Sequence, residues 1–161
     1  MMPVAVIVDW YGPYDSLTLF RASAREWAAN TRILYMALGA YNKIRYVGLT
    51  EKPGTRFYNH EKLRDDGNKA FFVGEIVTQG ISGRRSSKRA PDLNLAEHAL
   101  IRYLVPELNE RRTQVALSDC VSVFSRFFDP GDGETPVNPL PKFPLVIAYN
   151  SWSGKFVRLK S

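Results

Sequence analysis

Short apolar runs separated by turn residues predict a chain that alternates strands and helices. Residues 4–10 are rich in β-branched side chains and have the length of a strand. In residues 16–29 the apolar positions recur at helical intervals after a serine that suits an N-cap, which predicts an amphipathic helix. Two further runs, about 32–38 and 44–49, flank residues 39–42, whose glycine and asparagine tolerate positive φ. They predict a β-hairpin.

The rest of the chain continues this alternation. Residues 55–66 predict a helix that ends at an Asp-Gly pair, and residues 69–79 predict a strand. A third helix is expected to start near residues 91–94 and to run to about 105, where a proline stops it. After it, residues 115–124 look like a strand and residues 143–159 like a closing hairpin.

Length and composition are those of one compact domain. The chain has 161 residues, of which 45% are hydrophobic, enough for a sizeable core. We therefore expect a single domain over residues 1–161. The longest apolar runs are far shorter than the ~20 residues of a membrane-spanning helix, so no membrane segment is predicted. The single cysteine, Cys120, cannot form an internal disulfide, which favours a reducing, cytoplasmic setting.

The charge of the chain is +6, with an isoelectric point near 9.5. Such a balance favours a polyanionic partner such as nucleic acid. Residues 78–92 concentrate positive charge among Gly and Ser, and the segment reads as a loop that is either a solvated linker or a phosphate-contacting element. Its cations are Arg84, Arg85, Lys88 and Arg89.

Four polar residues follow the first apolar runs at regular intervals. Tyr35 and Tyr46 are equidistant from the predicted turn, so they should face each other with their Cβ atoms about 5 Å apart. Arg56 and His60 are four residues apart, hence on one face of the next helix. Each pair alone also fits ordinary packing or surface decoration. The two pairs alone therefore do not indicate one shared site, and the inference depends on further residues.

Glu97 is the most informative of these. It lies on the same helical stripe as Leu100, Ile101 and Leu104, so its carboxylate should be buried. A buried carboxylate needs a partner, either a base or a metal ion. The spacing to Asn94 also fits a capping box, and periodicity does not separate the two interpretations. Together with an arginine, a histidine and two phenols, this carboxylate completes a set suited to phosphodiester hydrolysis.

Residues 33–112 resemble the GIY-YIG nuclease family. The resemblance rests on the order and spacing of Tyr35, the Tyr46-Val47-Gly48 tripeptide, Arg56, His60, Glu97 and Asn109. Ile33-Leu34-Tyr35 stands where the family has Gly-Ile-Tyr, a change that removes no chemical group. The resemblance implies a small α+β domain with a central three-stranded antiparallel sheet flanked by helices. Residues 1–32 and 113–161 would then be an N-terminal strand and helix and C-terminal β segments outside the family core.

The resemblance also implies a role for each residue. Tyr35 would be the favoured general base for the attacking water, and Tyr46 would share that role or orient the water. Arg56 would hold the scissile phosphate, and His60 would contact phosphate or assist the departing oxygen. Glu97 would coordinate Mg²⁺ or Mn²⁺. Asn109 would assist through hydrogen bonds. Apart from the resemblance, Lys43 and Arg45 lie close enough to Tyr46 in sequence to favour its phenolate, and we expect them to contact nucleic acid.

The leading hypothesis is thus a metal-dependent endonuclease that acts on DNA, expected to be double-stranded, as a monomer or homodimer. A nucleic-acid-binding module of the same family that does not cleave is an alternative, suggested by the altered first tripeptide and the large flanks. A structural or protein-interaction domain is another. Salt-sensitive binding without cleavage would favour the second hypothesis, and failure to bind nucleic acid at low salt would favour the third.

Overall fold

The strands form one sheet that runs through the whole fold. The computed structural model describes residues 4–27, 33–77 and 90–158. Its seven-stranded sheet has the order β3-β2-β4-β1-β5-β6-β7, and all neighbours are antiparallel except β1 and β5, which are parallel. The strands are β1 Val4–Tyr14, β2 Ile33–Leu38, β3 Ile44–Thr50, β4 Ala70–Val77, β5 Val121–Phe128, β6 Val146–Asn150 and β7 Lys155–Arg158.

The prediction of a small three-stranded antiparallel sheet is wrong. The three expected strands are present as β3, β2 and β4, but the sheet continues beyond them. β1 pairs with the edge of β4 that a three-stranded sheet would leave open, and its Val6, Val8 and Trp10 extend the buried face. β5 then pairs with β1 in parallel. Both flanking segments therefore belong to the same sheet. By pairing with β4, β1 covers an edge that would otherwise be exposed.

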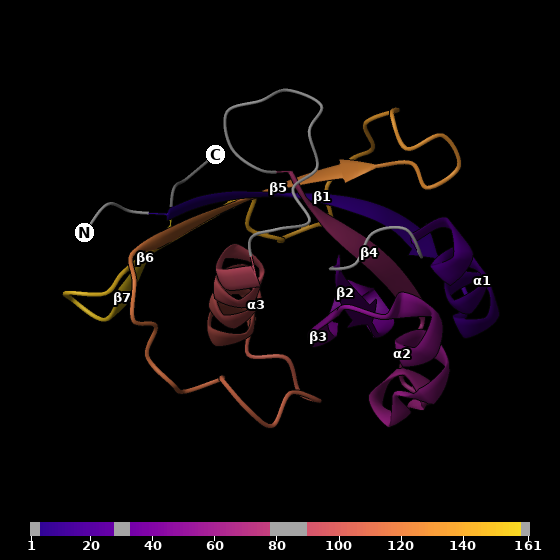
Figure 1. Ribbon diagram of the computed structural model, residues 1–161, viewed down its shortest axis with the longest axis horizontal. Coiled ribbons are helices and arrows are strands. Elements are labelled where there is room, and N and C mark those ends of the chain that lie inside the picture. Colours follow the sequence, from indigo (N-terminus) through magenta and orange to yellow (C-terminus); the bar gives the residue numbers. More distant parts are fainter. Residues whose placement is uncertain (1–3, 28–32, 78–89, 159–161) are drawn as a thin grey trace.

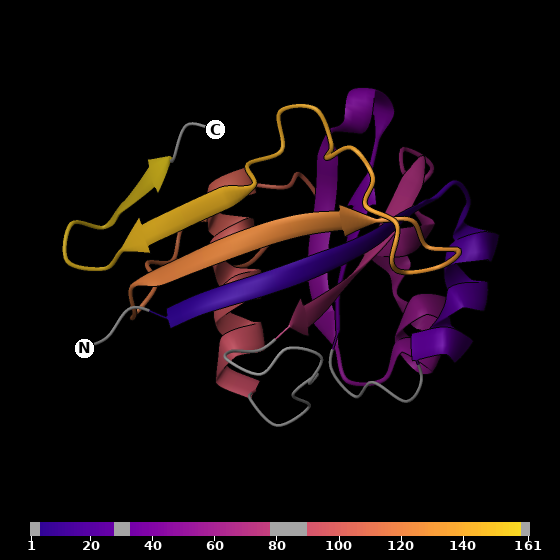
Figure 2. The same cartoon turned by 90° about the horizontal axis from the view of Figure 1, so that it is seen from above.

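Helices cover the two faces of this curled sheet. The helices are α1 Leu17–Trp27, α2 Pro53–Asn59 and α3 Ala90–Leu104, with 3₁₀ turns at Ala40–Asn42 and Glu61–Arg64. Figure 1 shows α3 on one face and α1 with α2 on the other, with β2 and β3 between them. Seen from above, β1 and β5 cross β2 and β3 at a steep angle (Figure 2), as expected for a strongly twisted sheet.

A separate hydrophobic core lies on each face. Under α3 the core includes Trp10, Met36, Phe72 and Leu100, all at most 2% exposed. On the other face Phe20 of α1 is central. Its ring stacks on Phe57 of α2 at 4.1 Å between centroids and on Phe71 of β4 at 4.9 Å. Phe57 in turn contacts Tyr35, with 5.5 Å between the ring centroids. The second core therefore ties α2 to the strand that carries Tyr35.

The predicted helix over residues 55–66 is interrupted at His60. Its backbone is extended there (φ −79°, ψ 114°), so α2 ends at Asn59 and a 3₁₀ turn follows. Arginines bind the carbonyl groups that a longer helix would use. Arg21 Nε donates to Phe57 O at 3.0 Å, and Arg64 Nη2 donates to Tyr58 O at 2.9 Å. These tertiary contacts satisfy the free carbonyls of the helix end, a constraint that local sequence does not contain.

The remaining boundaries correct or confirm the sequence predictions. The helix expected from residues 91–94 begins at Ala90, so Asn94 lies inside α3 and the capping-box interpretation of Glu97 is wrong. The strand expected at 115–124 lies at Val121–Phe128, because that segment pairs with β1 and β6. The closing hairpin is confirmed as β6 and β7. No helix in the described ranges has the length and apolar character needed to cross a membrane.

Candidate functional site

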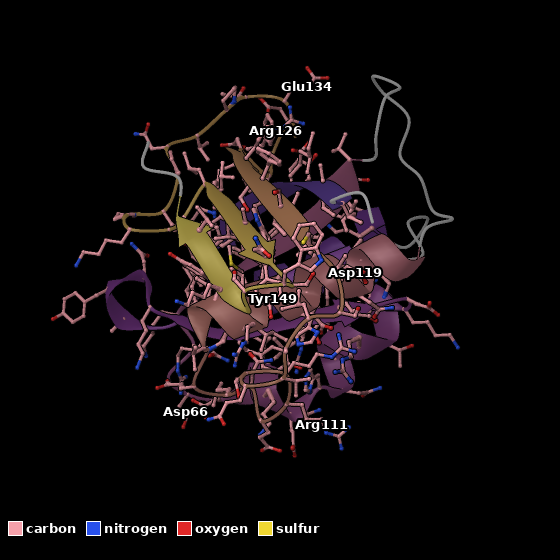
Figure 3. The ribbon with its side chains drawn as sticks, turned by 90° about the vertical axis from the view of Figure 1, so that its left-hand side faces the viewer. Asp66, Arg111, Asp119, Arg126, Glu134 and Tyr149 are labelled. Atoms are coloured by element: carbon pink, nitrogen blue, oxygen red, sulfur yellow. The ribbon has the colours of Figure 1, made fainter. Side chains whose placement is uncertain are left out.

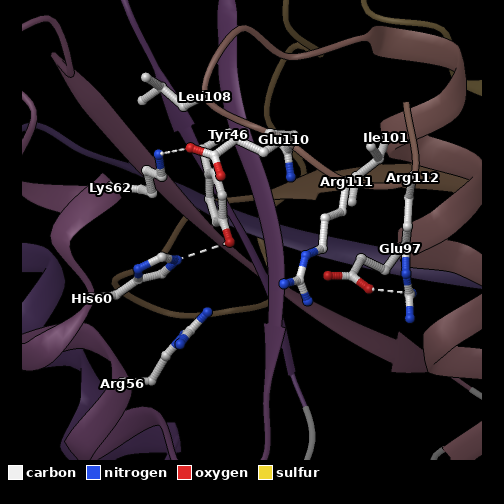
Figure 4. Close-up of a pocket in the computed structure, with 11 residues that line it drawn as sticks. Tyr46, Arg56, His60, Lys62, Glu97, Ile101, Leu108, Glu110, Arg111 and Arg112 are labelled. Carbon is white, nitrogen blue, oxygen red and sulfur yellow. Dashed lines mark hydrogen bonds and ion pairs between the residues drawn. The ribbon is translucent and has the colours of Figure 1, made fainter. Parts of the chain in front are cut away.

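A hollow of about 430 Å³ lies along the outer edge of β3, between α2 and α3. Figure 4 shows Tyr46, Arg56 and His60 on one side of it and Glu97 with Arg112 on the other. The full lining is Tyr46, Arg56, His60, Lys62, Glu97, Ile101, Leu108, Asn109, Glu110, Arg111 and Arg112. Of the six residues predicted to act in catalysis, five line this one hollow. Tyr35 is the exception.

Tyr46 and His60 form a direct pair. The Tyr46 hydroxyl and His60 Nε2 lie 2.8 Å apart and share a hydrogen bond, and the two rings meet edge to face. Burial, reinforced by the charges of Arg56 and Lys62, lowers the pKa of His60 from 6.5 to about 4. Burial raises the pKa of Tyr46. At neutral pH the imidazole is therefore uncharged and the phenol holds its proton. In the tautomer that carries its own proton on Nδ1, His60 accepts this hydrogen bond through Nε2.

Tyr35 lies beneath the hollow rather than in its wall. It is 0% exposed, and burial raises the pKa of its phenol far above the usual value, with the neighbouring Tyr46 acting in the same direction. Its hydroxyl accepts a hydrogen bond of 2.9 Å from Arg56 Nε. Water has no path to a fully buried phenol, so this placement favours a supporting role. Tyr35 orients Arg56.

The two tyrosines are diagonal neighbours, not directly opposed as predicted. Tyr35 pairs with Gly48 and Tyr46 pairs with Ala37, because the register shifts between Ala37 and Leu38 next to the 3₁₀ turn. The rings still lie 5.9 Å apart, packed over Gly48. A Cβ on Gly48 would come within 2.7 Å of both rings. The glycine of the Tyr46-Val47-Gly48 tripeptide is thus required for the two phenols to approach each other.

Arg56 points its guanidinium into the hollow from α2 (Figure 4). Its Nε is held by Tyr35, which leaves the terminal nitrogens directed at the cavity. Arg56 and His60 line the same wall although they no longer share one helix, because His60 follows the last turn of α2. The prediction that these two side chains lie on one face of a single helix is therefore wrong, because α2 ends between them.

Glu97 has the basic partner that its buried position demands. Its side chain is 13% exposed, and Oε2 accepts an ion-pair hydrogen bond of 2.7 Å from Arg112 Nη1. Burial raises the pKa of Glu97, and the charge of Arg112 opposes this shift. The helical stripe predicted a buried carboxylate, and the side chain is in fact largely, not fully, buried. Arg112 was not predicted because it lies fifteen residues away, after α3 has ended.

Asn109 makes the hydrogen bonds expected of it, and they close the edge of β3. Its Oδ1 accepts from Val47 N at 3.0 Å, and its Nδ2 donates to Val47 O at 2.9 Å. Leu108 N donates to Arg45 O at 2.9 Å in the same way. An edge strand needs such cover. Both polar ends of the Asn109 amide are occupied, so this residue is not available as a metal ligand.

Lys43 and Arg45, which were also predicted to contact nucleic acid, do not line the hollow. Lys43 and Arg45 both pair with Glu107, and Arg45 also pairs with Asp65 at 2.6 Å, so these cations hold the hairpin to neighbouring segments. The basic loop with Arg84, Arg85, Lys88 and Arg89 lies outside the described residues. Sequence reasoning missed Lys62, Glu110, Arg111 and Arg112. The consecutive arginines after Asn109 were the signal that could have found the last two.

The donor set is compatible with a single Mg²⁺ or Mn²⁺ at Glu97. No group of three or more metal-binding side chains occurs within the described ranges. Mg²⁺, however, is often bound through one or two carboxylates, with water and substrate phosphate as its other ligands. Glu97 offers one carboxylate in the wall of an open hollow, with one oxygen engaged by Arg112. The residues fit a loosely held ion rather than a closed protein cage.

Comparison with known proteins adds no relative: no family model, curated protein or solved structure matches the chain.

Proposed function

We propose that the chain is a phosphodiester hydrolase of the GIY-YIG type, a divalent-metal-dependent endonuclease acting on DNA. One observation carries the proposal. A phenol hydrogen-bonded to a neutral imidazole, a guanidinium directed at the cavity and a largely buried carboxylate all face one hollow on a basic protein. These groups come from three separate elements, so their meeting is not a consequence of local packing.

The base in this proposal is Tyr46 rather than Tyr35. Tyr46 lines the hollow, whereas Tyr35 is fully buried. In the free site the proton stays on the phenol, because burial raises the Tyr46 pKa and lowers the His60 pKa. A phosphate bound to Arg56 brings negative charge close to the imidazole and raises its pKa. The proton of Tyr46 then moves to His60 as the phenol oxygen takes a proton from the attacking water.

Arg56 holds the phosphate and stabilises the charge that grows on it. Because Tyr35 anchors its Nε, the two terminal nitrogens are oriented without an entropic cost at the moment of reaction. Mg²⁺ or Mn²⁺ at Glu97 would supply further positive charge at the phosphate oxygens. Double-stranded DNA as substrate, a cytoplasmic setting and action as a monomer or homodimer are parts of the same proposal.

Cleavage assays with two matched carboxylate variants test it. The protein is incubated with supercoiled plasmid and with single-stranded DNA, in Mg²⁺, Mn²⁺ or EDTA. Glu97→Gln should lose activity by at least about a hundredfold, on the order of the loss of one stabilising group. Glu110→Gln is the control, since Glu110 lines the same hollow but is 78% exposed and paired with Lys62. Undiminished cleavage by the Glu97→Gln protein would end the proposed role of Glu97.

A second candidate is a nucleic-acid-binding module that does not cleave. The observation that favours it is the ion pair between Glu97 and Arg112, which already neutralises the carboxylate that would hold the metal. Under this alternative the protein binds DNA with a strong dependence on salt, and no divalent ion produces cleavage.

A further inference from the structure

The charges in the hollow do not cancel. Four cationic side chains and two carboxylates line it, and His60 is neutral. Lys62 pairs with Glu110 at 2.7 Å, and Arg112 pairs with Glu97 at the same distance. In the described part of the chain no carboxylate lies within ion-pair distance of the remaining two cations, Arg56 and Arg111. The hollow therefore carries a net charge of +2 from two unneutralised guanidinium groups.

These two arginines approach the hollow from different elements. Arg56 comes from α2, and Arg111 from the segment that follows α3. In Figure 4 the Arg111 side chain extends into the hollow, with Tyr46 on one side and Glu97 on the other, and Arg56 lies across from it. Figure 3 places Arg111 on the opposite side of the molecule from Arg126, which is bound by Asp9.

The segment that presents Arg111 is fixed on both sides of it. Asn109 is hydrogen-bonded to Val47, and Glu110 to Lys62 across the hollow. Immediately after Arg111, Arg112 has a positive φ of 66° and is paired with Glu97. Arg111 is exposed and forms no hydrogen bond of its own with described residues, so nothing in the fold explains its direction. Two like charges around one cavity repel each other, and an anion bound between them outweighs this repulsion by attracting both.

We propose that Arg111 is a second phosphate-contacting residue, and that Arg56 and Arg111 bind the same phosphate of a nucleic-acid backbone from two sides. A phosphodiester carries one negative charge, and the five-coordinate species carries two once the attacking water has lost a proton to the Tyr46–His60 pair. The two guanidinium groups therefore attract the doubly charged reacting state more strongly than the singly charged substrate, which is the arrangement that accelerates a reaction. The catalytic consequence rests on the proposed function, whereas the phosphate contact does not.

Binding in EDTA tests the contact without any need for cleavage. The probe is a fluorescently labelled oligo-dT, and its affinity for the full-length protein is measured by anisotropy over a range of salt concentrations. Arg111→Gln should lower the slope of log K against log[salt] by about 0.7, the value for one contact to a single strand. Arg111→Lys should keep the slope. The control is Arg25→Gln, which removes the same charge from an exposed site on α1 and should leave the slope unchanged.

A double variant tests whether one phosphate is shared. If Arg56 and Arg111 bind the same phosphate, the fold-loss in affinity of the Arg56→Gln/Arg111→Gln protein is clearly smaller than the product of the fold-losses of the two single variants. Multiplicative losses would mean two separate phosphates and would overturn the shared site. An unchanged slope in Arg111→Gln would overturn the contact itself, even in an active nuclease. If Arg111→Gln lowers the slope but the wild-type protein never cleaves DNA, the nuclease proposal fails while the phosphate site remains.

Discussion

Replacing Tyr35 or Tyr46 by phenylalanine should distinguish the phenol that orients Arg56 from the phenol that acts as general base. In Tyr35→Phe the ring stays in the core, but Arg56 Nε loses its acceptor at 2.9 Å. Hydrogen bonds to charged groups contribute about 1.5–3 kcal/mol, and we expect the lower end because Arg56 is partly exposed. In Tyr46→Phe the lost partner is the neutral His60 at 2.8 Å, which costs about 0.5–1.5 kcal/mol.

The effects on rate should run in the opposite order. Removing a general base lowers the rate about 10²–10⁴-fold, so single-turnover cleavage by Tyr46→Phe should fall that far. Tyr35→Phe should lose on the order of tenfold, because Arg56 keeps its charge and loses only one orienting contact. Urea unfolding gives the stability of each variant and quenched cleavage of a labelled duplex gives the rate. A rate for Tyr35→Phe below that of Tyr46→Phe would refute the assignment of the base.

Three further predictions concern the frame of the site. Gly48→Ala should cost about 1–3 kcal/mol in unfolding free energy and also lower activity, since a Cβ would meet both phenol rings at 2.7 Å. The control is Gly54→Ala, because a Cβ at Gly54 would meet no atom within 4 Å. This control should show no loss of stability in the same urea titration. Asn109→Ala should cost about 1–3 kcal/mol through the two hydrogen bonds to Val47, and a midpoint equal to wild type would contradict this. Folding lowers the His60 pKa from 6.5 to about 4, so the unfolded chain binds the proton more tightly than the folded protein. His60 therefore leaves the unfolding free energy unchanged above pH 6.5 and lowers it as the pH falls from 6.5 toward 4. After discounting for the partly exposed ring, this loss is about 1–2 kcal/mol. Urea midpoints between pH 7 and 4.5 should therefore depend less on pH in His60→Asn.

Local pattern was sufficient for most of the individual elements. The hairpin of β2 and β3, strand β4 and the closing hairpin of β6 and β7 follow from short apolar runs and from turn residues between them. The largely buried position of Glu97 follows from the 3.6-residue period of α3. Five of the six residues predicted as catalytic line one hollow. Their meeting there was predicted from the family resemblance rather than from local pattern.

Local pattern failed where a distant segment decides the outcome. The end of α2 at Asn59 depends on Arg21 and Arg64, which take its last carbonyl groups. The register of β2 and β3 depends on the 3₁₀ turn between them, whose Tyr41 and Asn42 both have positive φ. A shift of this kind moves each side chain relative to its cross-strand partner, and hydrophobic alternation alone tolerates it.

What the sequence by itself determined is therefore the type of each element and the chemical groups that the hairpin, α2 and α3 carry. Only the tertiary structure decided that the sheet has seven strands, that Tyr35 is buried while Tyr46 faces the hollow, and that Arg111 and Arg112 join the site. The reason is physical. Periodicity reports which face of an element avoids water, whereas strand partners and ion pairs are chosen by contacts between residues far apart in the chain.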